Sequence, residues 1–366
     1  MNLSVGIVGF PNVGKSTLFN ALRSAQGKFS QGEGAKTANY PFTTIEPNVG
    51  VVPVPDDRLE RMADVIRKTE QVKSDFKIIP ATVRFVDIAG LVKGAHKGEG
   101  LGNQFLSHIR EVDAIVFVLR GFKSGDIINT GSDPASDLEV LKSELLLKDL
   151  ETIDKRLSSF EKELKTASTL DPRRKAFDNL KKAQELVSSG DWLRDSLDEE
   201  SLESISDLQL LSAKKTIVVV NSDEGDLKKE PPITDALGIS AKLEEELATL
   251  SDSEQRDYLG ELGIEESGLV KLVKKAHETL GLMSFLTAGP KEVRAWTIRR
   301  GSTASRAAGT IHSDFEKGFI AADVVSFSDF IKFNGWKNAK AQGKVLTIGK
   351  NDQILDGMVV EFKFSV

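Results

Sequence analysis

The sequence predicts an α/β fold in which a parallel sheet is interrupted by a helical segment and followed by a small β-rich module. Short apolar runs separated by helical stretches indicate the sheet, because such alternation is typical of parallel strands with crossover connections. Nearly a hundred residues with a different apolar periodicity separate two of these runs. At 366 residues, the chain is also longer than one compact domain usually needs.

Four apolar runs are the predicted strands of the sheet, at residues 5–8, 82–86, 114–119 and 216–220. The first run stops at Gly9, as expected of a short buried parallel strand, and the last is β-branched at every position. A helix is expected to begin near Thr17. We predict that this sheet domain comprises residues 1–125 and 205–282.

The segment 126–204 is the predicted helical insertion. Its apolar residues recur at alternating spacings of four and three, the seam spacing of a two-stranded coiled coil, from Leu146 to Leu164. Asp171 and Pro172 break this pattern, and it resumes from Ala176 to Val187. Two helices joined by a short charged turn predict an antiparallel hairpin, with one face of an ordinary helical bundle as the alternative.

The C-terminal segment 283–366 has short apolar stretches punctuated by glycines, which indicates a β-rich module large enough to fold alone. The net charge of the whole chain is −6, so any contact with nucleic acid must come from a local basic patch. The absence of Cys excludes disulfides, thiolate zinc sites and a cysteine nucleophile. With no signal peptide and no long apolar run, we expect a cytoplasmic protein without membrane contact, and we expect a monomer.

Residues 9–16, G-F-P-N-V-G-K-S, match the phosphate-binding pattern G-x-x-x-x-G-K-[ST] between a predicted strand and a predicted helix. Glycines allow successive backbone N–H groups to surround an anion, and the helix N-terminus adds a positive end. Lys15 is expected to bridge the β- and γ-phosphates, and the Ser16 hydroxyl to ligate Mg²⁺. The residues expected to hold the phosphates are Asn12, Val13, Gly14, Lys15, Ser16 and Thr17.

Three further positions complete the predicted phosphate and Mg²⁺ site. Asp87 follows the strand 82–86, where an acid would bind Mg²⁺ through water, and the backbone N–H of Gly90 would reach the γ-phosphate. Thr44 is the expected switch threonine for Mg²⁺ and the γ-phosphate, with Thr43 as the alternative. Position 91 is Leu, which cannot orient the attacking water, so hydrolysis must use other groups or be slow.

The base-binding loop N-S-D-E, residues 221–224, follows the strand 216–220. GTP-binding proteins use N-K-x-D here, with the Asp accepting two bonds from guanine. This chain keeps Asn221 but has no Lys after it, and its acid is Glu224, so adenine fits as well as guanine. The expected base-contacting residues are Asn221, Ser222, Glu224, Ser240 and Ala241.

Taken together, these motifs resemble the YchF/Obg-like ATPase family of P-loop proteins over essentially the whole chain. The phosphate loop reads G-F-P-N-V-G-K-S-T at 9–17, and the next segments read N-Y-P-F-T-T-I-E-P-N at 39–48 and D-I-A-G-L-V-K-G-A at 87–95. The resemblance continues with G-E-G-L-G-N-Q-F-L at 98–106, T-A-G-P-K-E-V-R-A-W-T-I at 287–298 and I-H-S-D-F-E-K-G-F-I at 311–320. The last two resemble the TGS domain of this family.

The resemblance implies a Ras-like P-loop domain interrupted by a coiled-coil-like insertion and followed by a β-grasp-like TGS domain. It implies slow hydrolysis of ATP in preference to GTP, with Lys15, Thr44 and the Gly90 backbone as catalytic groups. Leu91 matches the apolar residue that replaces the catalytic glutamine in this family. Asn12 matches a residue that helps some relatives bind an activating K⁺ ion. Family members often have a histidine within the strand predicted here at 114–119, and a cysteine shortly after that strand. This chain has Phe117 and Gly121 at these positions.

The implied partner is the ribosome or its subunits, with RNA contact through basic clusters and a role in translation or stress regulation. One cluster, with Trp296, comprises Lys291, Arg294, Arg299, Arg300 and Arg306; the other comprises Arg173, Arg174, Lys175, Lys181 and Lys182. Ordinary solvated charge is the alternative reading of both clusters. Against the ATPase stands a binding module whose hydrolysis is incidental. A small-molecule kinase is disfavoured because the sequence contains no recognisable lid or acceptor site.

Overall fold

The computed structural model describes residues 3–31, 48–72, 74–88, 101–123, 133–165, 168, 171 and 173–365, without the side chains of 26–31 and 101–104. The chain divides into two compact units. One comprises residues 4–21 and 85–268, and the other comprises 1–3, 22–84 and 269–366. Thr43, Thr44, Gly90 and Leu91 lie outside the described residues. No helix within the described part of the chain is long and apolar enough to cross a membrane.

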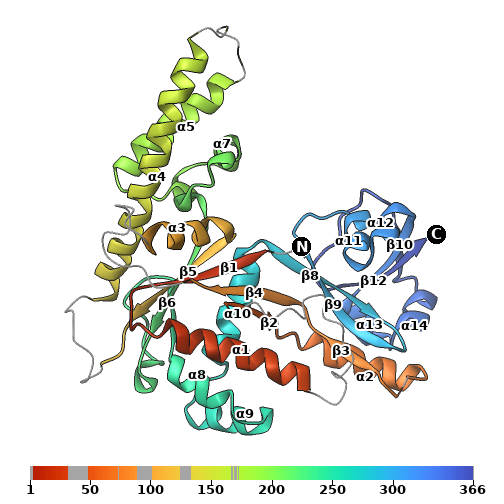
Figure 1. The fold of residues 1–366 in the computed structure, drawn as a ribbon. Coiled ribbons are helices and arrows are strands. Elements are labelled where there is room, and N and C mark those ends of the chain that lie inside the picture. Colours follow the sequence, from red (N-terminus) through yellow and green to blue (C-terminus); the bar gives the residue numbers. More distant parts are fainter. Residues whose placement is uncertain are drawn as a thin grey trace. The chain divides into compact units, whose positions relative to one another are not determined.

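A parallel sheet forms the centre of the first unit (Figure 1). Its strands are β1 (Ser4–Val8), β5 (Ala114–Arg120), β6 (Lys215–Asn221) and β7 (Leu237–Ile239), adjacent in that order, and the end of β4 (Thr82–Asp87) lies beside β1. The pairs β1–β5, β5–β6 and β6–β7 are all parallel. All four predicted strands are therefore present. The helix after β1, α1 (Lys15–Gln31), begins two residues before the predicted position.

The insertion is a helical hairpin, as predicted. Helices α4 (Pro134–Leu164) and α5 (Arg173–Ser188) run side by side (Figure 1). The Asp133 side chain caps α4 by accepting bonds from the N–H groups of Ala135 and Ser136. The buried seam residues of the two helices are Leu146, Ile153, Leu157, Phe160, Leu164, Leu180, Ala183 and Val187, all named by the apolar spacing.

The hydrophobic core of the hairpin is continuous with that of the sheet. Its seam belongs to one apolar cluster that continues through α3 (Leu101–Glu111) to strand β5. Between α5 and β6 the chain forms α6 (Leu193–Ser196), α7 (Glu199–Ser204) and the 3-10 turns η3 (Ser206–Leu208) and η4 (Leu211–Ala213). Buried Asp149 of α4 accepts bonds from the backbone N–H groups of Leu211 and Ser212 and from the Ser212 hydroxyl, at 2.6–2.8 Å. Helix α4 is thus tied directly to η4.

The remaining elements of the first unit follow β6. They are η5 (Glu224–Asp226), α8 (Ala241–Leu247) and α9 (Asp252–Glu261). Leu243 and Leu247 of α8 form a small apolar cluster with Leu259 of α9. Ser251 and Glu254 form a capping box at the start of α9. These elements flank the loop that was predicted to bind the base.

The second unit contains the β-rich module predicted at 283–366. Its sheet has the order β11-β10-β12-β8-β9-β3. The strands are β8 (Leu282–Ala288), β9 (Glu292–Arg299), β10 (Phe319–Ser326), β11 (Leu346–Ile348) and β12 (Met358–Phe364). The last strand in the order, β3 (Lys77–Ile79), comes from far earlier in the chain and pairs in parallel with β9. The sequence patterns did not indicate this strand.

Helices cover the module and complete the second unit. They are α11 (Ala304–Ile311), α12 (Ser313–Lys317), α13 (Phe327–Lys332) and α14 (Trp336–Ala341), together with α2 (Arg58–Thr69) and α10 (Gly268–Thr279), most of which belongs to this unit. Strand β2 (Val49–Pro53) precedes α2. Arg58 at the start of α2 forms ion pairs with Asp56 and Asp356, at 2.7 and 2.9 Å. An early segment of the chain is thereby joined to the C-terminal module.

Candidate nucleotide-binding site

The phosphate loop lies between β1 and α1, as its motif predicts. Asn12 and Gly14 adopt left-handed backbone conformations, with φ of 63° and 96°. Gly14 is required for space as well, because a Cβ atom there would lie 2.2 Å from Nδ2 of Asn221. After this turn, helix α1 begins at Lys15. The first backbone N–H groups of a helix have no intrahelical partner, so they are available to a ligand. This conformation suits the binding of phosphate by backbone N–H groups.

Lys15 is held over the loop. Its side chain is buried, and Nζ donates a hydrogen bond to the carbonyl oxygen of Phe10 at 2.7 Å. Burial lowers the pKa of Lys15, and the negative charge of Asp87 opposes this shift. A desolvated ammonium fixed above backbone N–H groups is the arrangement that the phosphates of a nucleotide require.

Asp87 ends strand β4 and is half-buried. Burial raises the pKa of its carboxyl group, whereas the charge of Lys15 lowers it. Among the described residues, no donor forms a hydrogen bond with this carboxylate, so its oxygens are free to bind a cation or water. Ser16 is exposed in the first turn of α1. A hydroxyl and a carboxylate are hard oxygen ligands that fit Mg²⁺.

Asn221 connects three segments of the site. Its Nδ2 donates to the carbonyl oxygen of Val13 at 2.9 Å, and its Oδ1 accepts from the backbone N–H of Ala241 at 2.9 Å. The side chain is only 7% exposed. Asn221 thus ties the end of β6 to the phosphate loop and to the start of α8. The sequence motif named Asn221 as a base-contacting residue and gave no sign of these two partners.

Of the other predicted base-binding residues, Ser240 and Ser222 form hydrogen bonds within the fold, and Glu224 is exposed. The Ser240 hydroxyl caps α8 by accepting a bond from the backbone N–H of Leu243. The backbone N–H of Ser222 donates to the carbonyl of Ile239 at 2.8 Å. Glu224 is exposed at the start of η5, and its charge raises the pKa of Tyr258. Glu224 therefore stands at the acid position of the motif and is accessible to a base, and the neighbouring Asp223 is exposed as well.

Asp223 has a role that the sequence patterns did not reveal. Its Oδ2 accepts a hydrogen bond from the backbone N–H of Lys123 at 3.1 Å. The neighbouring N–H of Gly121 donates to the carbonyl of Asn221 at 2.8 Å. Asp223 therefore secures the segment that leaves β5 against the base-binding loop. Asp223 and Glu224 are both exposed, but one carboxylate oxygen of Asp223 is committed to this bond.

Phe117 and Gly121, the two residues that depart from the pattern of the resembled family, have physical explanations in the structure. Phe117 is fully buried and packs edge-on against Trp192, with ring centroids 6.2 Å apart. Position 117 therefore belongs to the hydrophobic core. At Gly121 a Cβ atom would lie 2.6 Å from Cγ1 of Val220 and 2.9 Å from the Ser222 hydroxyl. The close approach of the two loops therefore favours glycine at this position.

The described residues bring together the phosphate loop, Asp87, Asn221 and Ala241 at the carboxyl ends of neighbouring strands, where ligands of open α/β sheets bind. Val13 is buried and Thr17 is half-buried in the first turn of α1. Thr44 and the Gly90 backbone, also predicted for this site, are not among the described residues. Among those residues, no group of three or more His, Cys, Asp or Glu could hold a metal ion.

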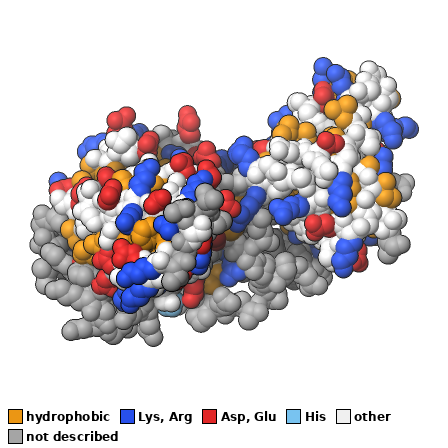
Figure 2. Space-filling view, turned by 90° about the horizontal axis from the view of Figure 1, so that it is seen from above, with side chains coloured by type: hydrophobic (Ala, Val, Ile, Leu, Met, Phe, Trp, Pro, Cys, Tyr) orange, Lys and Arg blue, Asp and Glu red, His pale blue; other side chains and the backbone are white. Residues whose placement is uncertain are grey.

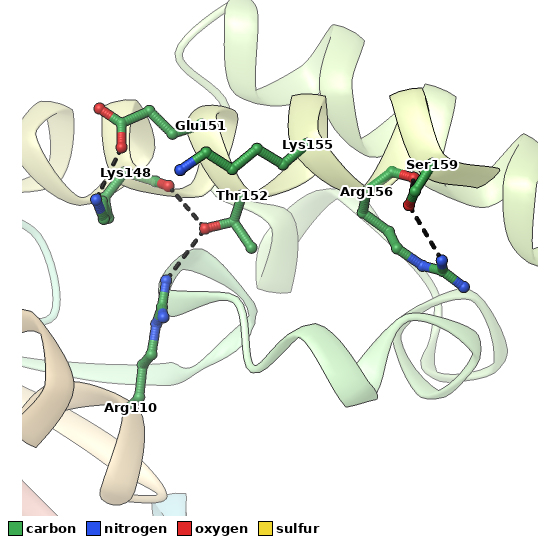
Figure 3. Close-up of a pocket in the computed structure, with 7 residues that line it drawn as sticks. All are labelled: Arg110, Lys148, Glu151, Thr152, Lys155, Arg156 and Ser159. Atoms are coloured by element: carbon green, nitrogen blue, oxygen red, sulfur yellow. Dashed lines mark hydrogen bonds and ion pairs between the residues drawn. The ribbon is translucent and has the colours of Figure 1, made fainter. Parts of the chain in front are cut away.

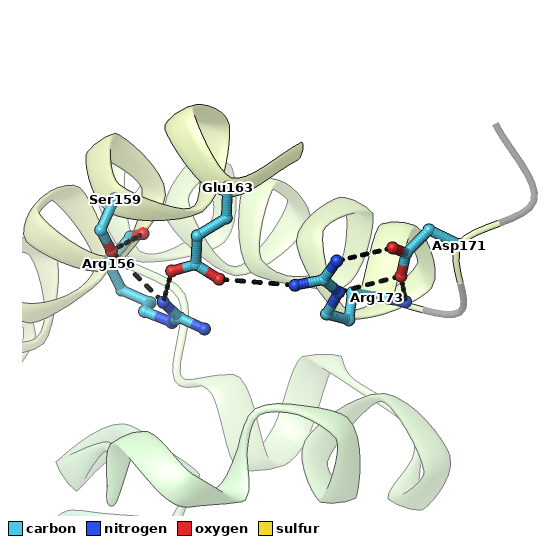
Figure 4. A network of polar contacts seen from close by, with 5 residues as sticks. All are labelled: Arg156, Ser159, Glu163, Asp171 and Arg173. Carbon is cyan, nitrogen blue, oxygen red and sulfur yellow. Dashed lines mark hydrogen bonds and ion pairs between the residues drawn. The ribbon is translucent and has the colours of Figure 1, made fainter. Parts of the chain in front are cut away.

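The hairpin cluster is partly paired with carboxylates, and the C-terminal cluster lies in a module of positive net charge. In the hairpin, Arg173 pairs with Asp171 at 2.7 Å and lies 4.0 Å from Glu163 (Figure 4), while Lys175 pairs with Glu200. Residues 282–366 contain twelve Lys and Arg against eight Asp and Glu, a net charge of +4 in a chain of −6. Figure 2 shows Lys and Arg side chains spread over the face of this module at the right of the view.

An aromatic platform accompanies the basic cluster of the C-terminal module. The guanidinium carbon of Arg294 lies 3.8 Å from the centroid of the Trp296 ring. That ring stacks on Phe285, with the centroids 6.4 Å apart, and its Nε1 donates to the Thr287 hydroxyl. The cation and the indole are thus held in a fixed arrangement.

Comparisons with known proteins cover the whole chain. A family model described as "50S ribosome-binding GTPase" (MMR_HSR1) matches residues 4–166, and one described as "Protein of unknown function (DUF933)" (YchF-GTPase_C) matches residues 282–365. The chain is 42% identical over 384 residues to "Ribosome-binding ATPase YchF" of Haemophilus influenzae and 40% identical over 390 residues to that of Bacillus subtilis. Both alignments cover 100% of each protein. A solved YchF GTPase of Schizosaccharomyces pombe is similar with a TM-score of 0.83 and 34% identity, covering 99% of this chain and 98% of that one.

Proposed function

The chain belongs to the YchF family and is a P-loop nucleoside triphosphate hydrolase, and we propose that it slowly hydrolyses ATP with Mg²⁺ as a ribosome-associated switch. The observation that carries this proposal is the arrangement around Asn221. This residue joins the phosphate loop to a base-binding loop in which an exposed Glu224 stands at the acid position of the motif. The loop thus retains the Asn of a nucleotide-binding site but lacks the Lys and Asp of a guanine clamp.

The preference for ATP over GTP rests on the chemistry of this loop. A guanine clamp needs a carboxylate that accepts two hydrogen bonds from N1 and N2 of the base. Asp223 already accepts a bond from the backbone N–H of Lys123, and the longer Glu224 occupies the position of the clamping acid. Adenine lacks the N2 donor, so it loses less than guanine when the clamp is incomplete.

The phosphates would lie on backbone N–H groups of residues 12–17, with the Lys15 ammonium against the β- and γ-phosphates. Ser16 and Asp87, with Thr44 from the segment outside the described residues, are the groups that would hold Mg²⁺. When bound, Mg²⁺ neutralises charge on the phosphate oxygens. Lys15 and the loop backbone position the triphosphate for attack, and such positioning alone supports slow turnover.

The attacking water must be oriented without a side chain from position 91, because Leu91 has no polar atom. The Gly90 backbone N–H is the group that we assign to the γ-phosphate. Asn12 is exposed in a left-handed conformation at the loop, where its amide oxygen is available to a monovalent cation. We therefore include K⁺ as a candidate activator. Equal ATPase rates in sodium and potassium buffers would rule out K⁺ as an activator.

The ribosome is the proposed partner, which places the proposed activity in the cytoplasm. The names of the relatives support ribosome binding, and the net charge of +4 in residues 282–366 suits contact with RNA phosphates. The Arg294–Trp296 pair adds an aromatic surface of the kind that stacks on unpaired bases. We propose that the β-rich module acts as a TGS domain in this contact, within a role in translation or stress regulation.

Parallel measurements of ATP and GTP affinity test the nucleotide assignment. The wild type should bind ATP more tightly, and Glu224→Asp should shift the ratio toward GTP by restoring the shorter acid. Lys15→Ala should abolish the binding of both nucleotides, and micromolar ATP affinity in this variant would refute the site. A wild type that strongly prefers GTP would overturn the adenine assignment alone.

A second measurement separates a working ATPase cycle from a switch whose hydrolysis is incidental. ATP turnover is measured with and without purified ribosomes, alongside co-sedimentation in the presence of ATP or ADP. Stimulated turnover indicates a cycle, whereas unchanged turnover with nucleotide-dependent sedimentation indicates the switch alone. Absence of both effects would overturn the ribosome as partner.

A further inference from the structure

A cavity of about 460 Å³ lies between the C-terminal end of α3 and the middle of α4, outside the nucleotide site (Figure 3). All the residues that line it belong to the first compact unit. Four of them are cationic, namely Arg110, Lys148, Lys155 and Arg156, whereas Glu151 is the one acidic residue. The cavity is therefore a positively charged hollow in a chain whose overall charge is negative.

The charges of Lys148 and Arg156 are already balanced by carboxylates. Lys148 pairs with Glu151 at 2.8 Å, and Arg156 pairs with Glu163 at 2.7 Å. For Arg110 and Lys155, no carboxylate among the described residues lies within ion-pair distance. These two side chains are the cations of the cavity that form no ion pair with a described carboxylate.

Arg110 is held in place by a neutral group. One terminal guanidinium nitrogen donates to the Thr152 hydroxyl at 3.1 Å (Figure 3). That hydroxyl in turn donates to the carbonyl oxygen of Lys148 at 3.1 Å. The oxygen of Thr152 thus orients the guanidinium without neutralising it. A fixed guanidinium loses less conformational freedom when it binds an anion than a free one would.

The Nε atom of Arg110 is buried and has no hydrogen-bond partner within the described part of the chain. A buried donor without a partner costs free energy, and this cost is larger for a charged group. The charge of Asp149 interacts with that of Arg110, but the carboxylate oxygens of Asp149 are bonded to the backbone of η4 and not to the guanidinium. The Lys214 ammonium, which donates to the carbonyl of Arg110, adds a further positive charge nearby.

We propose that this cavity binds phosphate groups, with Arg110 as the oriented donor and Lys155 as the mobile cation. Guanidinium groups match the geometry of phosphate oxygens, and an exposed Lys can close on them as a point charge. The volume of about 460 Å³ exceeds that of a single phosphate group, so the cavity has room for a chain of phosphates. The phosphates could come from a free polyphosphate or from the backbone of RNA. The site is independent of the proposed nucleotide-binding function.

The test uses the full-length Lys15→Ala variant, so that the phosphate loop does not contribute to binding. Calorimetric titration with tripolyphosphate should show about one bound equivalent. Adding Lys155→Gln, which changes an exposed side chain, should weaken the affinity about tenfold, as expected for the loss of a charged contact. Arg110→Gln should have at least the same effect. Lys162→Gln, an exposed change on the same helix, is the matched control and should have none.

Equal tripolyphosphate affinity in Lys155→Gln and Lys162→Gln would overturn the proposal, as would absence of binding in the Lys15→Ala parent. A labelled 12-nucleotide RNA distinguishes the two sources of phosphate. If the site takes an RNA backbone, RNA affinity falls in Lys155→Gln and tripolyphosphate competes. If it takes free polyphosphate, RNA affinity is unchanged by this substitution. With Lys15 intact, neither Lys155→Gln nor Arg110→Gln should change ATP affinity, which separates this site from the nucleotide site.

Discussion

Asn221 donates a hydrogen bond from Nδ2 to the carbonyl oxygen of Val13 across 208 positions of sequence. The opposite atom of the same amide, Oδ1, accepts from the backbone of Ala241. One side chain therefore sets the phosphate loop and the base-binding loop relative to each other. A carboxylate could not replace it, because an ionised carboxylate has no hydrogen to donate to Val13.

Asn221→Ala should weaken ATP binding by at least about tenfold, since it leaves the Val13 carbonyl and the Ala241 N–H without their buried partner. The free energy of unfolding should fall by about 2 kcal/mol for the same reason. Isothermal titration with ATP and urea unfolding measure the two effects. Asn179→Ala, which removes a half-buried bond to Ser204, is the matched control and should leave ATP affinity unchanged. Unaltered ATP affinity in Asn221→Ala would show that the loops do not depend on this amide.

Leu91→Ala should leave ATP hydrolysis measurable and within a few-fold of the wild-type rate. The physical reason is that neither side chain can hydrogen-bond to water, so the substitution removes no group that could orient the nucleophile. Single-turnover ATPase assays at saturating ATP check this expectation. Complete loss of hydrolysis, with ATP affinity retained, would mean that the apolar side chain itself organises the catalytic segment.

The parts of the fold that the sequence predicted are those with strong local signals. Strand β5 and the hairpin seam are continuous apolar patterns, and both appear where expected. Strands β3 and β7 have only three residues each, too few to establish a period, and β3 pairs with β9 more than two hundred residues away. The pairing of such short strands depends on tertiary contacts rather than on local sequence.

The site shows the same division. The phosphate loop and the acid at position 87 follow from spacing, because backbone geometry and strand ends are local properties. The bond from the Lys15 ammonium to the Phe10 carbonyl, the bond from the Lys123 N–H to the Asp223 carboxylate and the cationic cavity depend on groups that meet only after folding. A lysine or an aspartate in a loop carries no sequence signal for such a partner.

Asp149→Ala should destabilise the protein by about 3 kcal/mol, because it leaves the buried N–H groups of Leu211 and Ser212 without an acceptor. The effect should appear in the urea unfolding midpoint without loss of ATP binding by the folded protein. Asp154→Ala, on the same helix, removes an exposed bond from Gln184 and should cost less than about 1 kcal/mol. Equal effects of the two substitutions would show that η4 does not depend on the buried carboxylate.

Asp171 at the turn of the hairpin should titrate with a pKa of about 2, below its ordinary value of 3.8. The main cause is the Arg173 guanidinium, which donates to both carboxylate oxygens at 2.7 and 3.0 Å, and the backbone N–H of Arg173 adds a third bond (Figure 4). Because the pKa of Asp171 is lower in the folded state than in the unfolded state, the stabilisation from its bonds with Arg173 is complete above pH 3.8. It is lost as the pH falls from 3.8 toward 2.

Carbon-13 NMR of the aspartate carboxyl groups measures this titration directly. Arg173→Gln should move the Asp171 midpoint upward, but not fully to 3.8, because the backbone N–H of residue 173 still favours the ionised form. Arg194→Gln, which removes an arginine paired with Glu199 elsewhere in the insertion, should leave the midpoint unchanged. A wild-type midpoint near 3.8 would mean that the guanidinium does not hold this carboxylate in solution. The Asp171–Arg173 ion pair would then not form in solution, although the two residues are only two positions apart in the sequence.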